Sequence, residues 1–396
     1  MPVLLIHALL VVLALPAVPS SAYLLLATLL SRRLPVRLPK ANLLRFDIIV
    51  PAHNESGVIA RTVASLRKVD WPTDRFRIVV CADNCTDSTA ALARAAGAIA
   101  IERQDSNQRG KGYALAFAFE ASRAAAFADA VVVVDADTEV SANMIEAIAA
   151  RMEDGAQAVQ VHYGVLNPLA SWRTRLITIA KGAVHIVRSR ARERLSLSNG
   201  IRGTGWSVTH ALLRSVPYAA FSLTEDVEYG IALGLAGYRV AYADEADCNA
   251  EMVSSEQSAR TQRERWERGR FELMRTKTGP LLRAAWHRRS ALCLDLALDL
   301  LVLPISYVAL FIAALLAVAA IASAWIAGMQ IWLAIGAACA LSLFCYVMRG
   351  WQLSGIGLIG LVDLARAPGF LLWKLRLLLR KRKSNAWQRT DREQQP

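Results

Sequence analysis

Two aspartates one residue apart, Asp135 and Asp137, follow directly on four consecutive valines at residues 131–134. Two carboxylates on one short turn suit a hard divalent cation, Mg2+ or Mn2+, that shares its other positions with phosphate oxygens. The valines predict a strand buried on both faces of a sheet, which puts the aspartates at its carboxyl end, where open α/β sheets bind ligands. The alternative is a turn whose acids cap a helix over residues 141–152.

Further polar residues follow other predicted strands. Residues 46–50, 77–81 and 98–102 each predict a strand, and they alternate with helical patterns as βαβ units do. Asp83 follows the second of them, at the tip of the strand, where a nucleotide base or ribose would lie. The carboxyl ends of these strands are therefore expected to form a polar site.

Two more stretches carry residues suited to binding or catalysis. Residues 109–113 read Arg-Gly-Lys-Gly-Tyr, in which the glycines let the backbone approach an anion and Lys111 supplies a positive charge; a solvated lysine loop is the alternative. Asp226 begins a helix predicted to run to about residue 235. Ser222 and Glu225 have the spacing of a capping box, so Asp226 could merely favour the helix dipole. Both interpretations hold if Glu225 caps the helix while Asp226 faces a cleft.

The two ends of the chain predict a membrane protein. Of its 396 residues 55% are hydrophobic, and the apolar residues gather at the ends. Residues 1–31 predict a transmembrane helix, and the basic residues after it place the amino terminus outside, although a cleaved signal peptide is the alternative. Residues 46–285 predict one cytoplasmic α/β domain.

The carboxyl-terminal part predicts further membrane segments. Residues 291–350 predict two transmembrane helices, near 299–327 and 331–348. Residues 351–383 predict re-entrant and interfacial helices, and residues 384–396 a polar cytoplasmic tail. The net charge is +13, but the basic residues lie beside the apolar segments, which indicates membrane lipids and not nucleic acid as the partner. The six cysteines lack zinc spacing and are expected to be reduced.

Six motifs occur in a single order along the chain. They are Val-Pro-Ala-His-Asn-Glu at 50–55, Asp83 with its neighbours, Arg-Gly-Lys at 109–111, Asp-Ala-Asp at 135–137, Thr-Glu-Asp at 224–226 and Gln-Arg-Glu-Arg-Trp at 262–266. Together they resemble the membrane-bound family 2 glycosyltransferases, the branch with cellulose, hyaluronan, chitin-oligosaccharide and poly-N-acetylglucosamine synthases. The resemblance covers residues 46 to about 275. It implies a GT-A (Rossmann-like) fold flanked by transmembrane helices, an NDP-sugar donor and inversion at the anomeric carbon.

The resemblance also assigns roles to residues of this chain. It implies that Asp226 is the catalytic base and that Asp137 and Asp135 hold the metal. The expected donor-binding residues are Pro51, Glu55, Asp83, Lys111, Asp135 and Arg265, and the expected acceptor-binding residues are Trp266, Gln262, Glu225, Gly203 and Thr204. His53 departs from the aromatic residue of many relatives, so no stacking role is assigned to it.

The 262–266 motif lies on a helix predicted over residues 255–276. Gln262, Arg265 and Trp266 share one face of this helix at i, i+3 and i+4, so Arg265 could reach a diphosphate and Trp266 an acceptor sugar. The alternative is a basic amphipathic helix at the membrane surface. The glycine-rich residues 199–206 resemble an acceptor-side loop, in which Trp206 could be either core or ligand.

The expected enzyme is a hexosyltransferase of the cell inner membrane that extends a β-linked polysaccharide, with a UDP-sugar as the expected donor. The candidate partners are a saccharide or lipid-linked acceptor, membrane lipids and an export subunit. One alternative is single transfer to a lipid, as in ceramide glucosyltransferases or to a polyprenyl carrier. Another is a nucleotidyltransferase of the same fold, which would release pyrophosphate and not a nucleoside diphosphate.

Overall fold

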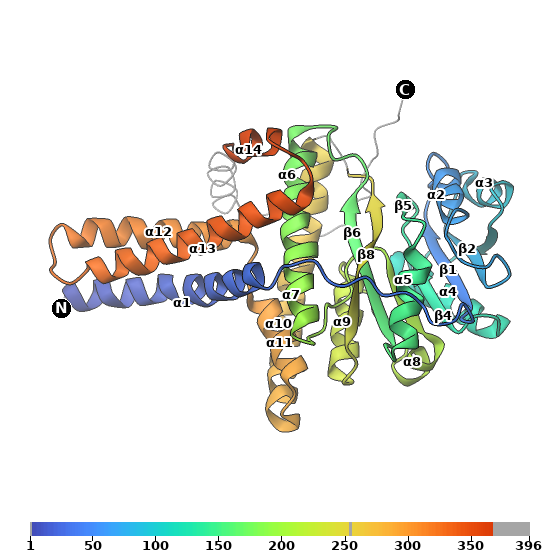
Figure 1. Cartoon of the computed structure of the whole chain (residues 1–396), viewed down its shortest axis with the longest axis horizontal. Coiled ribbons are helices and arrows are strands. Elements are labelled where there is room, and N and C mark those ends of the chain that lie inside the picture. The colour runs from blue at the N-terminus through green and yellow to red at the C-terminus, as the bar shows by residue number, and fades with distance from the viewer. Residues whose placement is uncertain (1, 253–255, 367–396) are drawn as a thin grey trace. The chain divides into compact units, whose positions relative to one another are not determined.

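The computed structural model describes residues 2–252 and 256–366. They form two compact units, and each is described by itself. The sheet unit contains Arg33–Ala170 and Arg192–Ala297, and the helical unit contains the described residues up to Arg32, Ser171–Ala191 and those from Leu298 onward. Figure 1 labels most of the elements of both units.

The sheet unit is built on one mixed sheet of eight strands in the order β3-β2-β1-β4-β7-β6-β8-β5. The strands are β1 (Phe46–Ala52), β2 (Phe76–Asp83), β3 (Ile99–Arg103), β4 (Ala130–Val133), β5 (Thr138–Val140), β6 (Ala158–Val165), β7 (Trp206–Thr209) and β8 (Val240–Ala250). The first four in the order are parallel, β7 is antiparallel to β4 and β6, β8 is parallel to β6, and β5 is antiparallel to β8. The carboxyl ends of β1, β2 and β4 therefore share one edge.

Helices cover both faces of this sheet. They are α2 (Ile59–Leu66), α3 (Thr89–Ala95), α4 (Lys111–Ala125), α5 (Met144–Glu153), α8 (His210–Ser215) and α9 (Glu225–Leu235). Helix α10 (Glu256–Arg288) belongs to the same unit and contacts α9. Helices α2, α3 and α5 contribute to the hydrophobic core on one face, and α4, α8 and α9 to the core on the other.

The valine run lies at the centre of the sheet and belongs to both cores. Val132 and Val134 pack into the core with α2 and α5, whereas Val131 and Val133 pack into the core with α4 and α9. All four side chains are fully buried. This alternation is what the two-residue repeat of a strand requires, and it confirms the prediction of a strand buried on both faces.

The helical unit contains three helices long and apolar enough to cross a membrane. They are α1 (Pro2–Leu29), α12 (Ile305–Ser323) and α13 (Gln330–Ser354), and they pack on one another through apolar clusters (Figure 1). The other elements are α6 (Trp172–Lys181), the π-helix η1 (Gly182–Val187) and α14 (Ile359–Leu364). Helices α7 (Arg188–Arg194) and α11 (Ala291–Leu301) connect the two units along the chain.

The π-helix η1 lies against α13. An added Cβ on Gly182 would be 2.6 Å from the carbonyl oxygen of Gly350, so only glycine allows this approach. The Tyr346 hydroxyl donates to the Ala183 carbonyl at 2.8 Å. These contacts hold η1, which lies between α6 and α7, against the candidate span α13.

The carboxyl-terminal segments differ in detail from their predicted bounds. The chain between residues 291 and 350 contains α11 as a separate helix before α12. After α13 the chain turns at Gly355 and Gly357, both with φ of +71°, and continues as α14. The remainder of the predicted interfacial segment, residues 367–383, and the predicted tail 384–396 lie outside the described residues.

Candidate active site

Three of the predicted site residues share the carboxyl edge of the sheet because of the strand register. Pro51 pairs with Cys81, two residues before Asp83. Ile49, two residues before Pro51, pairs with Val133, two residues before Asp135. Pro51 and Asp135 thus stand at the same level on adjacent strands, and Asp83 stands two residues further along β2 at the same edge of the sheet.

Lys111 is the cation at the centre of this edge. It is the first residue of α4, after Gly110 with φ of +127°. Its Nζ lies 2.6 Å from Asp135 Oδ1 and 3.5 Å from Glu225 Oε1, and it donates to the Gly203 carbonyl at 3.1 Å. Burial alone would lower the pKa of Lys111, but the charges of Asp135 and Glu225 outweigh it and raise that pKa. Lys111 therefore stays charged beside its acids.

Gly203 connects this lysine to Asp226. The backbone N–H of Gly203 donates to Asp226 Oδ2, and its carbonyl accepts from Lys111. Its φ is +60°, and an added Cβ would be 2.5 Å from Tyr163 Cε1. The next residue, Thr204, accepts from the backbone N–H of Asp135 at 2.9 Å through its hydroxyl. The predicted residues 203 and 204 thus join the Asp135 turn to Asp226.

Glu225 and Asp226 begin α9, but not through the capping box that Ser222 and Glu225 predict. The N-cap residue is Thr224, whose side chain makes no capping hydrogen bond. The Ser222 backbone N–H donates at 3.1 Å to Glu228 instead. The capping-box prediction was wrong, because the carboxylate of Glu225 lies 3.5 Å from Lys111 Nζ while the Ser222 N–H is taken by Glu228. A contact with a cation is stronger than a hydrogen bond from a neutral N–H.

The environment of Glu225 makes it hard to ionise. Its burial raises its pKa to about 7; the Lys111 charge opposes this rise, and the Asp226 charge adds to it. A carboxyl group that titrates near neutrality beside two other acids is typical of a functional site.

Asp135 and Asp137 have the chemistry of a partial metal site. Asp137 Oδ1 accepts from the Thr138 hydroxyl at 3.3 Å. Among residues 2–252 and 256–366, no cluster of three or more His, Cys, Asp or Glu side chains could hold a metal ion. Mg2+ commonly uses one or two carboxylates and completes its shell with water and substrate phosphates. The two aspartates therefore fit a cation that takes its other ligands from water or a bound substrate.

Asp83 lies at the end of β2 and has a charged partner, Arg103. Its side chain is 7% exposed and forms a 2.7 Å ion pair with Arg103. The backbone carbonyl of Asp83 lies 2.7 Å from His53 Nδ1. Arg103 immediately follows the strand predicted at residues 98–102, so the strand-end pattern that selected Asp83 could also have found it. Glu55 lies two residues after His53 in the chain, and its backbone N–H donates to the Thr89 hydroxyl at 2.8 Å.

The face of α10 with the Gln-x-x-Arg-Trp motif packs toward the start of α9. Gly269 of α10 touches Thr224: an added Cβ would be 2.6 Å from its Cγ2. Arg265 and Trp266 precede Gly269 by four and three residues, and Gln262 by seven, so all three share its face. Each of the three is partly buried. Nε of Arg265 is buried and has no hydrogen-bond partner among the described residues.

Two aromatic residues near the site have different roles. Tyr163 of β6, which no sequence motif indicated, lies against Gly203. Burial, and then the charges of Asp135, Asp137 and Asp226, raise the pKa of its phenol. Tyr163 was missed because β6 itself was not predicted. Trp206, left open between core and ligand, is core: it is fully buried and packs in the same core as Tyr229.

Comparisons with known proteins agree with this architecture. A family model described as glycosyltransferase like family 2 matches residues 44–269. The chain is similar to the mannosyltransferase PcManGT from Pyrobaculum calidifontis, solved with GDP-Man and Mn2+, at 18% identity and a TM-score of 0.52, over 85% of this chain and 97% of that one. It is also similar to TarS (residues 1–349) from S. aureus, at 21% identity and a TM-score of 0.42, over 60% and 65% of the two chains.

At these identities structural likeness concerns the fold alone. The family match and the similarity to the mannosyltransferase confirm the predicted α/β GT-A fold, flanked in the described part of the chain by three candidate transmembrane helices.

Proposed function

Because the chain belongs to the glycosyltransferase-like family 2, we propose that it transfers a sugar from a nucleoside-diphosphate sugar to a hydroxyl of a membrane-held acceptor, with inversion at the anomeric carbon. The observation that carries this proposal is the double role of Gly203. Its N–H binds Asp226, and its carbonyl binds Lys111. One residue thereby fixes the separation between a carboxylate suited to take a proton and a cation suited to bind a diphosphate.

The donor diphosphate is proposed to lie between Lys111 and Arg265. Lys111 already neutralises Asp135, and the buried Nε of Arg265 offers a donor that an anion would satisfy. Asp135 and Asp137 would hold Mg2+ or Mn2+, which when bound supplies positive charge to the leaving diphosphate. Pro51 and Asp83 are proposed to contact the nucleoside.

The nucleobase is proposed to donate to the carboxylate of Asp83. An imide N–H of uracil suits this contact, and UDP-sugars are the first candidates. A guanine N–H would suit it equally, so the carboxylate alone does not choose between them. The donor must be found by screening both classes.

Asp226 is proposed as the general base for the acceptor hydroxyl. Its carboxylate is held by the N–H of Gly203, which fixes the orientation that proton transfer requires. Glu225, Thr204 and the partly buried side chains of Gln262 and Trp266 are proposed to line the acceptor side. Trp266 offers a flat apolar surface on which a sugar ring can stack.

The first candidate acceptor is a growing β-linked polysaccharide at the cell inner membrane, because the complete Gln-x-x-Arg-Trp motif resembles that of processive synthases. One observation favours the alternative, which is transfer of a single sugar to a lipid. The described residues supply three candidate spans, and a polymer path through the membrane would then need an export subunit.

The test uses the full chain in native membranes with a panel of labelled UDP- and GDP-sugars. Release of the nucleoside diphosphate is measured beside release of pyrophosphate, and the products are sized. A ladder of products supports polymer extension, and a single lipid-soluble product supports single transfer. An Asp226→Asn chain in the same membranes is the control for contaminating transferases. Pyrophosphate release, or no product from any donor, would refute the proposal.

A further inference from the structure

Helix α11 has both of its acidic side chains on its inner side and a stripe of three leucines on its outer side. The side chains of Asp295 and Asp299 are 9% and 16% exposed. Leu294, Leu298 and Leu301 are 46%, 48% and 45% exposed and form one stripe at i, i+4 and i+7. A helix between a protein core and water ordinarily exposes its charged side chains and does not present a stripe of leucines on its outer face. The surroundings of the outer face are therefore expected to be apolar.

The inward aspartates are held by arginines of one helix, α7. Arg192 pairs with Asp295, and Arg188 pairs with Asp299. Burial alone would lower the pKa of the Arg188 guanidinium, but Asp299 outweighs it and raises that pKa, so this pair stays ionised. Turning the leucines inward would expel both carboxylates from their partners. The ion pairs thus fix which face of α11 looks outward.

The same helix is fastened to the end of α9. Cys293 Sγ donates to the Gly234 carbonyl at 3.5 Å, and an added Cβ on Gly234 would be 2.1 Å from Leu296 Cδ1. Arg288, just before α11, donates to the Leu235 carbonyl at 2.6 Å. Helix α9 begins at Glu225 and Asp226, so α11 supports the helix that carries the proposed base.

The chain itself brings α11 to a membrane surface. Leu301 is joined to Ile305, the first residue of the candidate span α12, by a link that can extend at most about 14 Å. Helix α11 has 11 residues and is about 16 Å long, roughly half the thickness of a bilayer's hydrocarbon core. It is too short to cross, so an apolar outer face suits a helix that lies in the plane of the surface.

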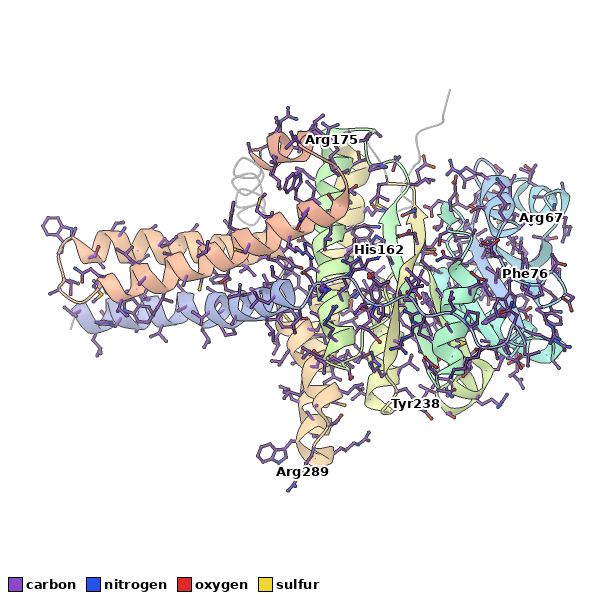
Figure 2. The ribbon with its side chains drawn as sticks, viewed as in Figure 1. Arg67, Phe76, His162, Arg175, Tyr238 and Arg289 are labelled. Atoms are coloured by element: carbon purple, nitrogen blue, oxygen red, sulfur yellow. The ribbon has the colours of Figure 1, made fainter. Side chains whose placement is uncertain are left out.

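The residues just before α11 have the composition of a protein segment that lies at a membrane interface. Trp286 is 84% exposed, and the neighbouring Arg283 and Arg289 are exposed as well. Figure 2 shows Arg289 at the tip where α10 turns into α11. Tryptophan and arginine together favour the headgroup layer, and the arginines favour anionic lipids.

We propose that the outer face of α11, defined by Leu294, Leu298 and Leu301, docks on the lipid bilayer at the boundary of headgroups and acyl chains, with Trp286 beside it. The occupant of this face is lipid. The bilayer surface thereby holds α11, and α11 holds the end of α9. This inference is independent of which sugar or acceptor the enzyme uses.

The test places one encoded environment-sensitive fluorophore in the full chain reconstituted in vesicles that contain anionic lipid. It replaces Leu298 in one variant and Leu294 in a second, which serves if the first does not fold. The matched control is Ile99 on β3, which is 47% exposed, against 48% for Leu298. Quenching is measured with lipids brominated near the headgroup, with lipids brominated at the chain ends, and with aqueous iodide.

For the fluorophore at position 298 we expect strong quenching by lipids brominated near the headgroup and weak quenching by iodide. For the fluorophore at position 99 we expect strong quenching by iodide and weak quenching by the brominated lipids. Three outcomes overturn the proposal. Iodide quenching at 298 equal to that at 99 means a face in water. Protection from both quenchers means a face covered by protein, such as a second copy of the chain. Stronger quenching by the chain-end bromines means a helix inserted deeply and not docked.

Discussion

The backbone N–H of Gly203 donates to the carboxylate of Asp226 from a left-handed backbone conformation, with φ of +60°. The ring of Tyr163 occupies the space that any side chain at position 203 would need. Tyr163 therefore keeps the glycine peptide aimed at the acid, and the acid keeps one orientation. The relationship makes position 203 a sensitive place to disturb the proposed chemistry.

Gly203→Ala is expected to reduce both stability and transfer. The left-handed conformation costs alanine about 1–2 kcal/mol, and its Cβ would collide with Tyr163. Displacing the Asp226 contact by even a fraction of an ångström is expected to lower kcat by roughly 10²-fold. The measurement is the unfolding temperature beside kcat.

The matched control is Gly200→Ala. Gly200 has φ of +72°, and an added Cβ there would meet nothing within 4 Å. It carries the same backbone strain without the collision, so the difference between the variants isolates the Tyr163 contact. Equal losses of kcat in both variants would contradict a special role for position 203.

Asp226→Asn is expected to leave donor binding near normal while transfer falls by about 10² to 10⁴, the range for a lost general base. The amide oxygen of asparagine can still accept from Gly203, so the local structure should survive. Calorimetric titration with the nucleoside diphosphate and single-turnover rates separate the two effects. Weaker nucleotide binding together with a lowered unfolding temperature would indicate a structural role instead.

Asp137→Asn is expected to act differently, because the counter-charge of the diphosphate is lost in both the ground state and the transition state. Donor binding and transfer should then fall together. Removal of divalent ions with a chelator should have the same effect on the unsubstituted chain, and Mn2+ or Mg2+ should restore it. Full activity in the chelator would remove the metal from the proposal.

The stability of the sheet unit is expected to fall as the pH rises from about 4.5 to about 7. In the folded chain burial raises the pKa of Glu225 from its ordinary value of 4.5 to about 7. Over this interval the folded state keeps a proton that the unfolded state has lost, so ionising Glu225 removes stability as the pH increases. Glu225→Gln should abolish this slope when unfolding is measured across the interval. The control is Glu120→Gln on exposed α4 surface, which should leave the slope in place.

The strands that could be predicted from the sequence are those whose own residues carry the strand pattern. Residues 131–134 are four β-branched residues, and a run of this kind has few other structures open to it. Strands β6, β7 and β8 were not predicted, and β7 is antiparallel to its neighbours. Their pairing joins segments far apart in the chain, and no short-range pattern carries that information.

Site residues could be predicted from the sequence where they follow a predicted strand or belong to a motif. Asp83 and Asp135 lie at one edge because parallel strands end together. Tyr163 was missed because its role depends on what it faces, whereas Arg103 directly follows a predicted strand and could have been found by the pattern that selected Asp83. The capping box at Ser222 failed for a related reason, since spacing along the chain could not reveal the buried lysine that draws Glu225 away.

The order of the strands has a consequence for synthesis on the ribosome. Strand β4 emerges beside β1, but its other neighbour, β7, is made only after α6 and η1, which belong to the helical unit. Until then a nascent chain exposes a valine-rich open edge, the kind of edge that recruits chaperones or aggregates. Strand β6 likewise waits for β8. The last strand, β8, ends at Ala250, well before the first residue of α12, so all eight strands can pair while α12 and α13, two of the candidate spans among the described residues, do not yet exist.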